Sequence, residues 1–174
     1  MTNENIILIG MPGCGKSTVG VLLAKALCMQ FVDTDMRIQN AEKKSLQRII
    51  NEKGNAYFIQ KEFEAVQAVI ASPEPKVIAT GGSVVLSPDT MRALQEEGTV
   101  VYLEAPFGLI KKRLWNLKTR GIVLNEGQTL HDMYKSRIVY YEKYAQHIIH
   151  VHRRTPEQIV NIITQQLKIK RFDA

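Results

Sequence analysis

The feature that most constrains the fold of this chain is a glycine-rich octapeptide near its start. Residues 10–17 read GMPGCGKS and fit the pattern G-x-x-x-x-G-K-[ST] of a phosphate-binding loop. An apolar run at residues 6–9 precedes the octapeptide, and apolar side chains recur at helical spacing over residues 19–27. This order of strand, glycine loop and helix predicts an α/β fold, because such a loop uses a strand end and a helix N-terminus to direct its N–H groups at phosphate oxygens.

The rest of the chain predicts a parallel sheet. Further apolar runs are short and continuous, and segments with helical periodicity separate them; the runs lie at residues 31–32, 77–79, 100–103 and 148–151. Continuous apolar strands are typical of a sheet with helices on both faces. We therefore predict a three-layer α/β/α arrangement around a five-stranded parallel sheet. With 174 residues and 45% hydrophobic content, residues 1–174 are expected to form a single domain.

Two segments extend beyond this core. In residues 36–72 the apolar side chains recur every three or four positions, which predicts two or three helices projecting from the sheet. Ser45 is a candidate N-cap for one of them and Gly54 a candidate stop. Residues 117–128 contain two glycines, few apolar anchors and several charges. That composition is typical of a mobile lid over a binding site.

The residues with chemical potential follow the ends of the predicted strands. Lys16 is expected to reach the outer phosphates of a nucleotide, and the hydroxyl of Ser17 is the expected magnesium ligand. Asp33 and Asp35 follow the second strand, at the sheet edge where ligands bind in open α/β folds. One carboxylate can hold magnesium or its water, and the other can accept the proton of an acceptor hydroxyl. These features predict a phosphotransferase that uses ATP and Mg²⁺.

A glycine turn follows the third predicted strand in the same way. Thr80, Gly81 and Gly82 would offer backbone N–H groups at a point where a ligand can approach the chain closely. The turn is therefore a candidate part of the acceptor site.

With the phosphate loop, the two aspartates and the glycine turn in this order, the chain resembles the shikimate kinase family over nearly its whole length. Residues 54–62 (GNAYFIQKE) resemble the family's G-E-x-x-F-R-x-x-E helix, and residues 137–145 (RIVYYEKYA) resemble its R-x-P-x-Y-x-x-x-A segment. Arg120 stands at the position of the family's lid arginine. The resemblance implies a P-loop kinase fold and ATP-dependent phosphorylation of the 3-hydroxyl of shikimate, a step towards chorismate and the aromatic amino acids.

The resemblance also implies which residues bind the nucleotide and the metal. Magnesium would be held by Ser17 and Asp33, and Arg120 would fold from the lid onto the transferring phosphate. The phosphates would be wrapped by the loop and the start of the helix, that is by Gly13, Cys14, Gly15, Lys16, Ser17 and Thr18. The adenine would be flanked by two later arginines, Arg113 and Arg154.

On the acceptor side, Asp35 would bind the substrate hydroxyls and is the candidate catalytic base, acting together with Lys16 and Arg120. The remaining acceptor contacts implied by the resemblance come from Gly81, Gly82, Arg137 and the position now held by Ile59.

Several positions depart from the family pattern. Ile59 replaces an arginine expected at the acceptor carboxylate, and losing that charge-assisted bond predicts roughly tenfold to over a hundredfold weaker binding of shikimate. Ser83 replaces a third glycine, residues 120–123 read RGIV instead of R-P-L-L, and Val139 replaces a proline. Two alternatives therefore stay open: the same chemistry on a different small hydroxylated acceptor, and a weakly active nucleotide-binding paralogue.

The overall charge excludes few partners but favours small anions. The net charge is +6, yet the basic residues are scattered and aromatic residues form only 7% of the chain, which is not the pattern of a nucleic-acid surface. The apolar run at residues 6–9 is too short for a signal peptide or a membrane span. We expect a cytoplasmic monomer with a small-molecule acceptor and no nucleic-acid or membrane partner.

Overall fold

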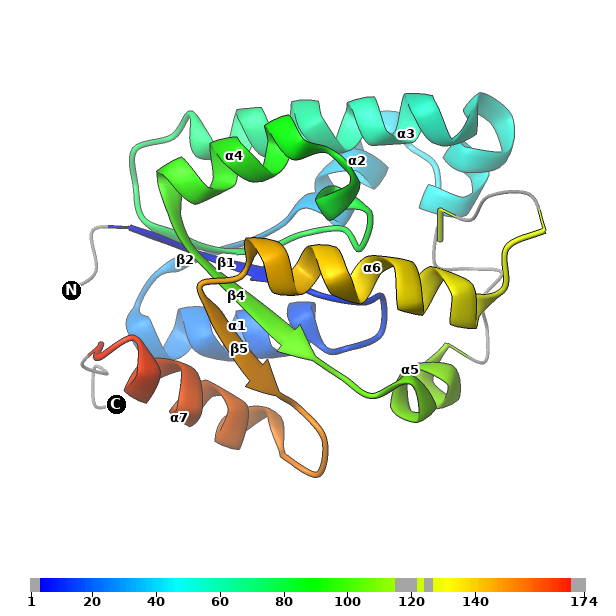
Figure 1. Ribbon diagram of the computed structural model, residues 1–174. Coiled ribbons are helices and arrows are strands. Elements are labelled where there is room, and N and C mark those ends of the chain that lie inside the picture. The colour runs from blue at the N-terminus through cyan, green and yellow to red at the C-terminus, as the bar shows by residue number, and fades with distance from the viewer. Residues whose placement is uncertain (1–3, 115–121, 124–126, 170–174) are drawn as a thin grey trace.

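Five parallel strands form the centre of the protein. The computed structural model describes residues 4–114, 122–123 and 127–169 (Figure 1). Across the sheet the strands are ordered β2-β3-β1-β4-β5, and every neighbouring pair is parallel. The strands are β1 (Asn5–Ile9), β2 (Gln30–Asp33), β3 (Lys76–Ala79), β4 (Gly98–Glu104) and β5 (His147–His150).

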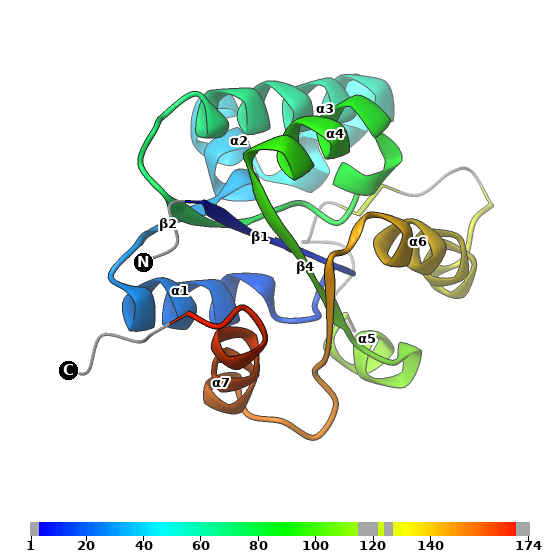
Figure 2. The same ribbon diagram turned by 60° about the vertical axis from the view of Figure 1, so that its left-hand side comes forward.

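Helices cover both faces of this sheet, as Figures 1 and 2 show. On one face α1 (Lys16–Leu27) packs against α7 (Pro156–Gln166), and on the other lie α3 (Leu46–Ile70), α4 (Pro88–Glu97) and α6 (Leu130–Tyr144). The predicted three-layer α/β/α architecture with a five-stranded parallel sheet is confirmed. The shorter elements are α2 (Thr34–Glu42), α5 (Phe107–Arg113) and a 3₁₀ turn, η1 (Val84–Leu86).

The core explains why the strands are apolar without alternation. β1 lies in the middle of the sheet, and the side chains of Ile6, Ile7, Leu8 and Ile9 are each 1% exposed or less. Helices on both faces leave neither side of the strand to water, so alternate positions are equally apolar. Among the helices that the structure describes, none is long and apolar enough to cross a membrane.

A second, smaller core lies where α2 meets α3, and it consists of Ile38, Leu46, Ile49, Phe58 and Val123. The N-terminus of α3 is capped as expected, because the hydroxyl of Ser45 accepts a hydrogen bond from the N–H of Arg48 at 3.4 Å. This core holds the two helices that follow β2 and thereby supports the residues at the end of that strand.

Gly54 interrupts α3 but does not end it. Its φ of 82° and ψ of 170° are non-helical, and helix continues on both sides of the resulting kink. The expected stop is therefore a change of direction within one element. Glycine suits the position because a side chain disfavours this backbone conformation.

The predicted lid at residues 117–128 falls mostly outside the described residues, and so does Arg120. Four of its residues, 122–123 and 127–128, are described, and the first two correct the expectation of weak anchoring: Ile122 and Val123 are each 5% exposed. Ile122 belongs to the main core and Val123 to the second core. The segment is thus attached to both cores at this point.

The kink yields a stability prediction. Replacing Gly54 with alanine is expected to lower the free energy of unfolding by about 1–3 kcal/mol, because alanine would be strained at this φ and ψ. No atom lies within 4 Å of the position of a new Cβ, so the cost comes from the backbone alone. Urea unfolding followed by circular dichroism measures the difference.

Gly108 in α5 provides the matched control. A new Cβ at this position would also meet no atom within 4 Å, but Gly108 carries no positive φ. Gly108→Ala is therefore expected to leave stability unchanged or raise it by up to about 1 kcal/mol. If both variants were equally stable, the kink would not require glycine.

Candidate active site

The phosphate loop has the backbone that its sequence predicts. Gly10, Gly13 and Gly15 have φ values of 143°, 81° and 112°, which side chains rarely adopt, and α1 begins directly afterwards at Lys16. The Lys16 ammonium donates hydrogen bonds to the carbonyl oxygens of Gly10 at 2.7 Å and Met11 at 3.1 Å. The lysine therefore lies inside the curve of the loop, where an anionic ligand would meet it.

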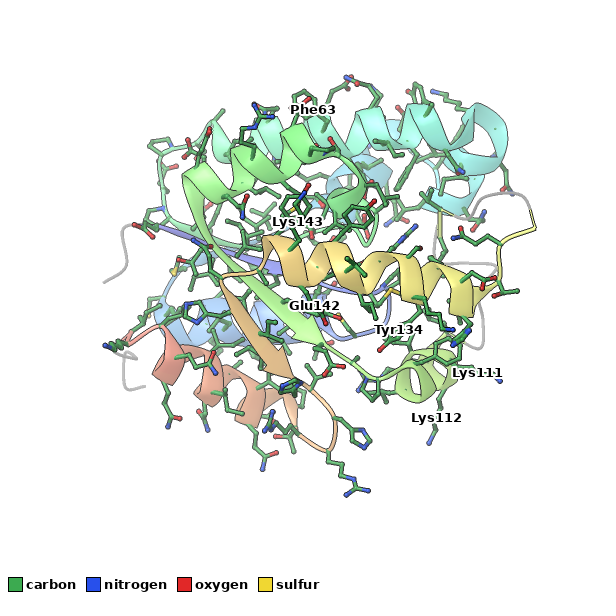
Figure 3. The ribbon with its side chains drawn as sticks, in the orientation of Figure 1. Phe63, Lys111, Lys112, Tyr134, Glu142 and Lys143 are labelled. Carbon is green, nitrogen blue, oxygen red and sulfur yellow. The ribbon has the colours of Figure 1, made fainter. Side chains whose placement is uncertain are left out.

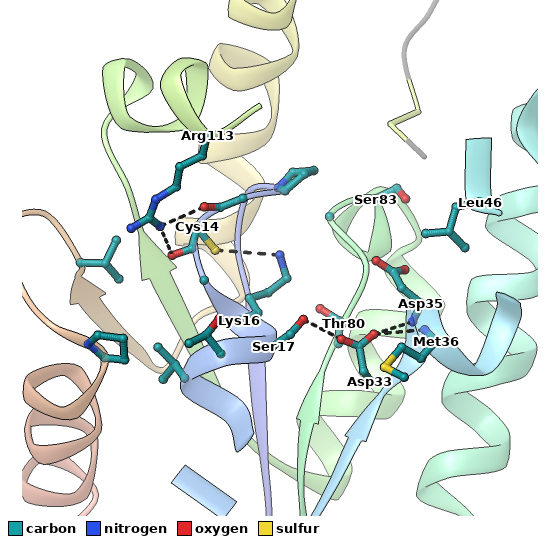
Figure 4. Close-up of a pocket in the computed structure, with 18 of the residues that line it drawn as sticks. Cys14, Lys16, Ser17, Asp33, Asp35, Met36, Leu46, Thr80, Ser83 and Arg113 are labelled. Carbon is teal, nitrogen blue, oxygen red and sulfur yellow. Dashed lines mark hydrogen bonds between the residues drawn. The ribbon is translucent and has the colours of Figure 1, made fainter. Parts of the chain in front are cut away.

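The two predicted magnesium ligands are brought together from α1 and the end of β2. The Ser17 hydroxyl donates a hydrogen bond to Oδ2 of Asp33 at 2.6 Å (Figure 4). The other carboxylate oxygen, Oδ1, accepts bonds from the N–H groups of Asp35 at 3.0 Å and Met36 at 3.2 Å, which caps α2. A hydroxyl beside a fixed carboxylate is a donor set of hard oxygens, and it fits Mg²⁺.

Asp35 is one residue into α2 and points towards the glycine turn. Its Oδ1 atom is shielded from solvent and has no hydrogen-bond partner among the described residues. Burial, followed by the charge of Asp33, raises the pKa of Asp35 to about 6, although Lys16 acts in the opposite direction. A carboxylate with a pKa nearer neutrality is a stronger base, which suits the role of accepting a hydroxyl proton.

The glycine turn after β3 leaves no space for side chains. A Cβ at Gly81 would lie 2.1 Å from Oε1 of Glu62 and 2.8 Å from Oδ1 of Asp35. A Cβ at Gly82 would lie 2.6 Å from the ring of Pro12 in the phosphate loop. The turn therefore lies directly between the phosphate loop and the two carboxylates.

Helix α6 holds the far side of this turn. Tyr141 is fully buried, and its hydroxyl donates to the carbonyl oxygen of Gly82 at 2.6 Å. One helical turn earlier, Arg137 is 3% exposed and donates to the carbonyl oxygen of Val123 at 2.6 Å. The arginine expected to bind the acceptor carboxylate is thus also attached to the lid segment.

The nucleotide side of the site contains both predicted adenine-flanking arginines. Arg113 in α5 donates to the carbonyl oxygens of Gly13 at 3.0 Å and Cys14 at 3.2 Å (Figure 4). Its neighbours Lys111 and Lys112 extend outward from α5 instead (Figure 3). Arg154 follows β5 and donates to the carbonyl oxygen of His150.

One cavity of about 580 Å³ connects these groups. Its walls include the phosphate loop, Asp33, Asp35, Gly82 and both arginines. Gly81, Ile59 and Arg137 are not among the lining residues; Gly81 lies next to the carboxylates of Asp35 and Glu62, and Ile59 is half-buried on α3. Further lining residues are Met36, Gln39, Leu46, Phe58, Glu62, Thr80, Ser83, Val151, Pro156 and Ile159.

Glu62 is the charged lining residue that sequence reasoning left without a role. It is 3% exposed and accepts a hydrogen bond from the Ser83 hydroxyl at 2.6 Å. Its spacing carried a signal, because Phe58, Glu62 and Val66 follow one another at intervals of four on α3 and all three are buried. A carboxylate on the apolar stripe of a helix is a candidate functional group.

Comparison with known proteins agrees with this geometry. The family model described as shikimate kinase matches residues 12–168. The shikimate kinase of Alkaliphilus oremlandii is 36% identical over 164 residues, which cover 92% of this chain and 96% of that protein.

Solved structures of shikimate kinases have a similar backbone fold. Shikimate kinase from Acinetobacter baumannii in complex with shikimate has a TM-score of 0.88 and 29% identity, covering 96% of this chain and 94% of that one. Shikimate kinase from Aquifex aeolicus has a TM-score of 0.81 and 30% identity, covering 94% and 96%. The family model spans most of the chain and the relative exceeds 30% identity over nearly all of it, so this chain belongs to the shikimate kinase family.

Proposed function

We propose that the chain transfers the terminal phosphoryl group of ATP to the 3-hydroxyl of shikimate. The observation that carries the proposal is the single cavity in which a phosphate loop, a hydroxyl–carboxylate pair for Mg²⁺ and a buried carboxylate beside a glycine turn converge. Phosphoryl transfer depends mainly on positioning and on electrostatic stabilisation, and these groups supply both. A cytoplasmic monomer suits two small soluble substrates.

On the nucleotide side, the backbone of residues 13–18 would hold the phosphates, and Ser17 and Asp33 would hold magnesium. When bound, the metal would supply positive charge that offsets the negative charge of the phosphates as the bond between the terminal phosphorus and the bridging oxygen breaks. Lys16 adds a second positive charge from inside the loop, where its side chain already lies against carbonyl oxygens.

On the acceptor side, Asp35 would accept the proton of the attacking hydroxyl as the new oxygen–phosphorus bond forms and ADP leaves. Asp35 lies next to Gly81, Gly82 of the same turn lies against Pro12 of the phosphate loop, and Asp35 and the loop line the same cavity. Arg137 would pair with the acceptor carboxylate, and five guanidinium N–H donors allow it to do so while still bonded to Val123.

A second acceptor is favoured by one specific observation. Ile59 carries no charge where the family pattern has arginine, so the region lacks one positive charge and suits an acceptor with fewer anionic groups. The same cavity and the same catalytic residues would serve it.

The direct test is the formation of ADP and of a phosphorylated product when shikimate, ATP and Mg²⁺ are supplied, with the product identified by ³¹P NMR. A thermal-shift comparison of small hydroxylated acids, with an ATP analogue present, runs beside it. A ligand at 100 times its dissociation constant adds about 2.7 kcal/mol of stability. Turnover of another acid without turnover of shikimate would favour the second acceptor, and no turnover with any acid would favour the weakly active paralogue.

Removing Lys16 is expected to abolish transfer without unfolding the chain. Lys16→Ala should lower kcat by about 10²–10³-fold, because the variant loses a preorganised charge at the transferring phosphate. Lys25→Ala, an exposed position on the same helix, is the control and should leave kcat unchanged. ATP turnover and a circular dichroism melt are measured together, and a folded Lys16→Ala protein with full turnover would refute the role of the loop.

Replacing each of the two aspartates with asparagine is expected to change different kinetic parameters. Asp35→Asn should lower kcat by about 10²–10⁴-fold with little change in the KM for ATP, because it removes the general base. Asp33→Asn should raise the Mg²⁺ concentration needed for half-maximal rate, while asparagine preserves the cap of α2. Identical kinetic profiles for the two variants would contradict the separate assignments.

A further inference from the structure

Glu62 has surroundings that an ionised carboxylate rarely has. The side chain is 3% exposed, and one oxygen, Oε2, accepts a hydrogen bond from Ser83 at 2.6 Å. The other oxygen, Oε1, is shielded from solvent and has no hydrogen-bond partner among the described residues. A buried carboxylate in this situation needs a nearby cation or a proton.

The cations that face Glu62 are bonded to backbone carbonyls instead. Lys16, at the start of α1, donates to two carbonyl oxygens of the phosphate loop. Arg137, on α6, donates to the carbonyl oxygen of Val123. Neither is among the ion pairs found between described residues, so each acts on Glu62 only through its charge at a distance.

The other groups that face Glu62 are acidic or neutral. Asp35 from α2 lies close to Glu62 next to Gly81, because a single Cβ at Gly81 would approach both carboxylates within 3 Å. Tyr141 from α6 contributes only a neutral phenol, because burial raises the pKa of its hydroxyl above the ordinary value. Like charges at this spacing disfavour two ionised carboxylates.

Burial and the charge of Asp35, in that order, raise the pKa of Glu62 to about 8, and the Ser83 hydrogen bond, Arg137 and Lys16 offset only part of this. Helix α4, which also packs against α3, contributes no compensating charge, since its Arg92 pairs with Asp89 and both are exposed. The contacts and the electrostatics of the site therefore both favour the protonated, neutral form of Glu62.

Two of the departures from the family pattern meet at this side chain. Ile59 lies three residues before Glu62 on α3, a spacing at which side chains are neighbours on a helix, so an arginine there could pair with the glutamate. Ser83 replaces a glycine, and its hydroxyl is the group that bonds to Oε2. One departure removes a cation next to Glu62 and the other adds a neutral hydrogen-bond donor.

We propose that Glu62 is a specificity-determining residue that works as a neutral carboxylic acid and thereby compensates for Ile59 in the binding of an anionic acceptor. The family pattern brings two arginines and one glutamate to this region, a net charge of one positive unit. Arg137 beside an uncharged Ile59 and an uncharged Glu62 gives the same net charge. An ionised Glu62 would cancel Arg137, and the acceptor carboxylate would meet no net attraction.

This inference rests on the proposed function, and the KM for shikimate as a function of pH tests it. The shikimate carboxylate stays ionised throughout the measured range, from below to above the Glu62 pKa of about 8. The parent enzyme is expected to keep a constant KM from about pH 7, where Asp35 with its pKa of about 6 is ionised, up to about pH 8, and to show a KM that rises by up to about tenfold per pH unit above it.

Two variants are expected to remove this rise. Glu62→Gln keeps the shape and cannot ionise, so its KM should not depend on pH in this range. Ile59→Arg places a cation one turn from Glu62, which should hold the glutamate ionised and also flatten the profile. Glu64→Gln is the matched control, because Glu64 is an exposed residue on the same helix that pairs with Lys61, and its profile should follow the parent.

A second readout is independent of activity. Glu62 has a folded pKa above its ordinary value of 4.5, so the folded protein holds an extra proton between about pH 4.5 and about pH 8. The stability of the parent relative to Glu62→Gln should therefore fall as pH rises through that window and stay constant below it. At about pH 7, where Asp35 is ionised, infrared difference spectra should show the C=O band of a protonated carboxyl group in the parent and not in Glu62→Gln.

The outcomes separate this inference from the proposed function. A flat KM profile in the parent, or an absent carboxylic-acid band, would overturn the neutral Glu62 even if shikimate is turned over. Loss of shikimate binding by Glu62→Gln at every pH would show that the ionised form is the working one. Absence of shikimate turnover at any pH, with the infrared band present, would instead count against shikimate as the acceptor.

Discussion

The parallel pairing of β1 with β3 on one side and β4 on the other is the constraint on which the site depends. Leu8 of β1 is in register with Ala79 of β3, and the next residue, Thr80, bonds to the Leu8 carbonyl through its N–H at 3.2 Å and its hydroxyl at 3.0 Å. Parallel strands in this register end at the same edge of the sheet. The phosphate loop and the glycine turn consequently meet, although about 70 residues separate them in the chain.

The elements that local patterns specify could be predicted from the sequence. The glycines of the phosphate loop, the continuous apolar strands and the cap at Ser45 each depend on residues within a few positions of one another. The Ser17–Asp33 pair was also within reach, because a strand-end carboxylate and a loop hydroxyl converge in any fold with this order. The kink at Gly54 was predicted only as a stop, since a positive φ ends a helix and redirects one equally well.

The state of individual side chains could not be predicted in this way. The bond of Arg137 to Val123 and that of Ser83 to Glu62 join residues 14 and 21 positions apart on different elements. Whether a buried carboxylate has a cation beside it depends on all the elements around it, and no periodicity in one helix contains that information. The burial of Ile122 and Val123 could not be predicted for a related reason, because two apolar residues among charged ones form no periodic pattern.

The contact between Pro12 and Gly82 has a consequence for how this protein can change over evolutionary time. The proline ring belongs to the loop for one substrate and the glycine to the turn for the other, and a Cβ at Gly82 would come within 2.6 Å of that ring. Neither the loop nor the turn can move without displacing the other, because closely packed interiors transmit a shift of a few tenths of an ångström instead of absorbing it. A lineage that acquires a side chain at position 82 must also alter its proline, so the two substrate sites are bound to diverge as a pair.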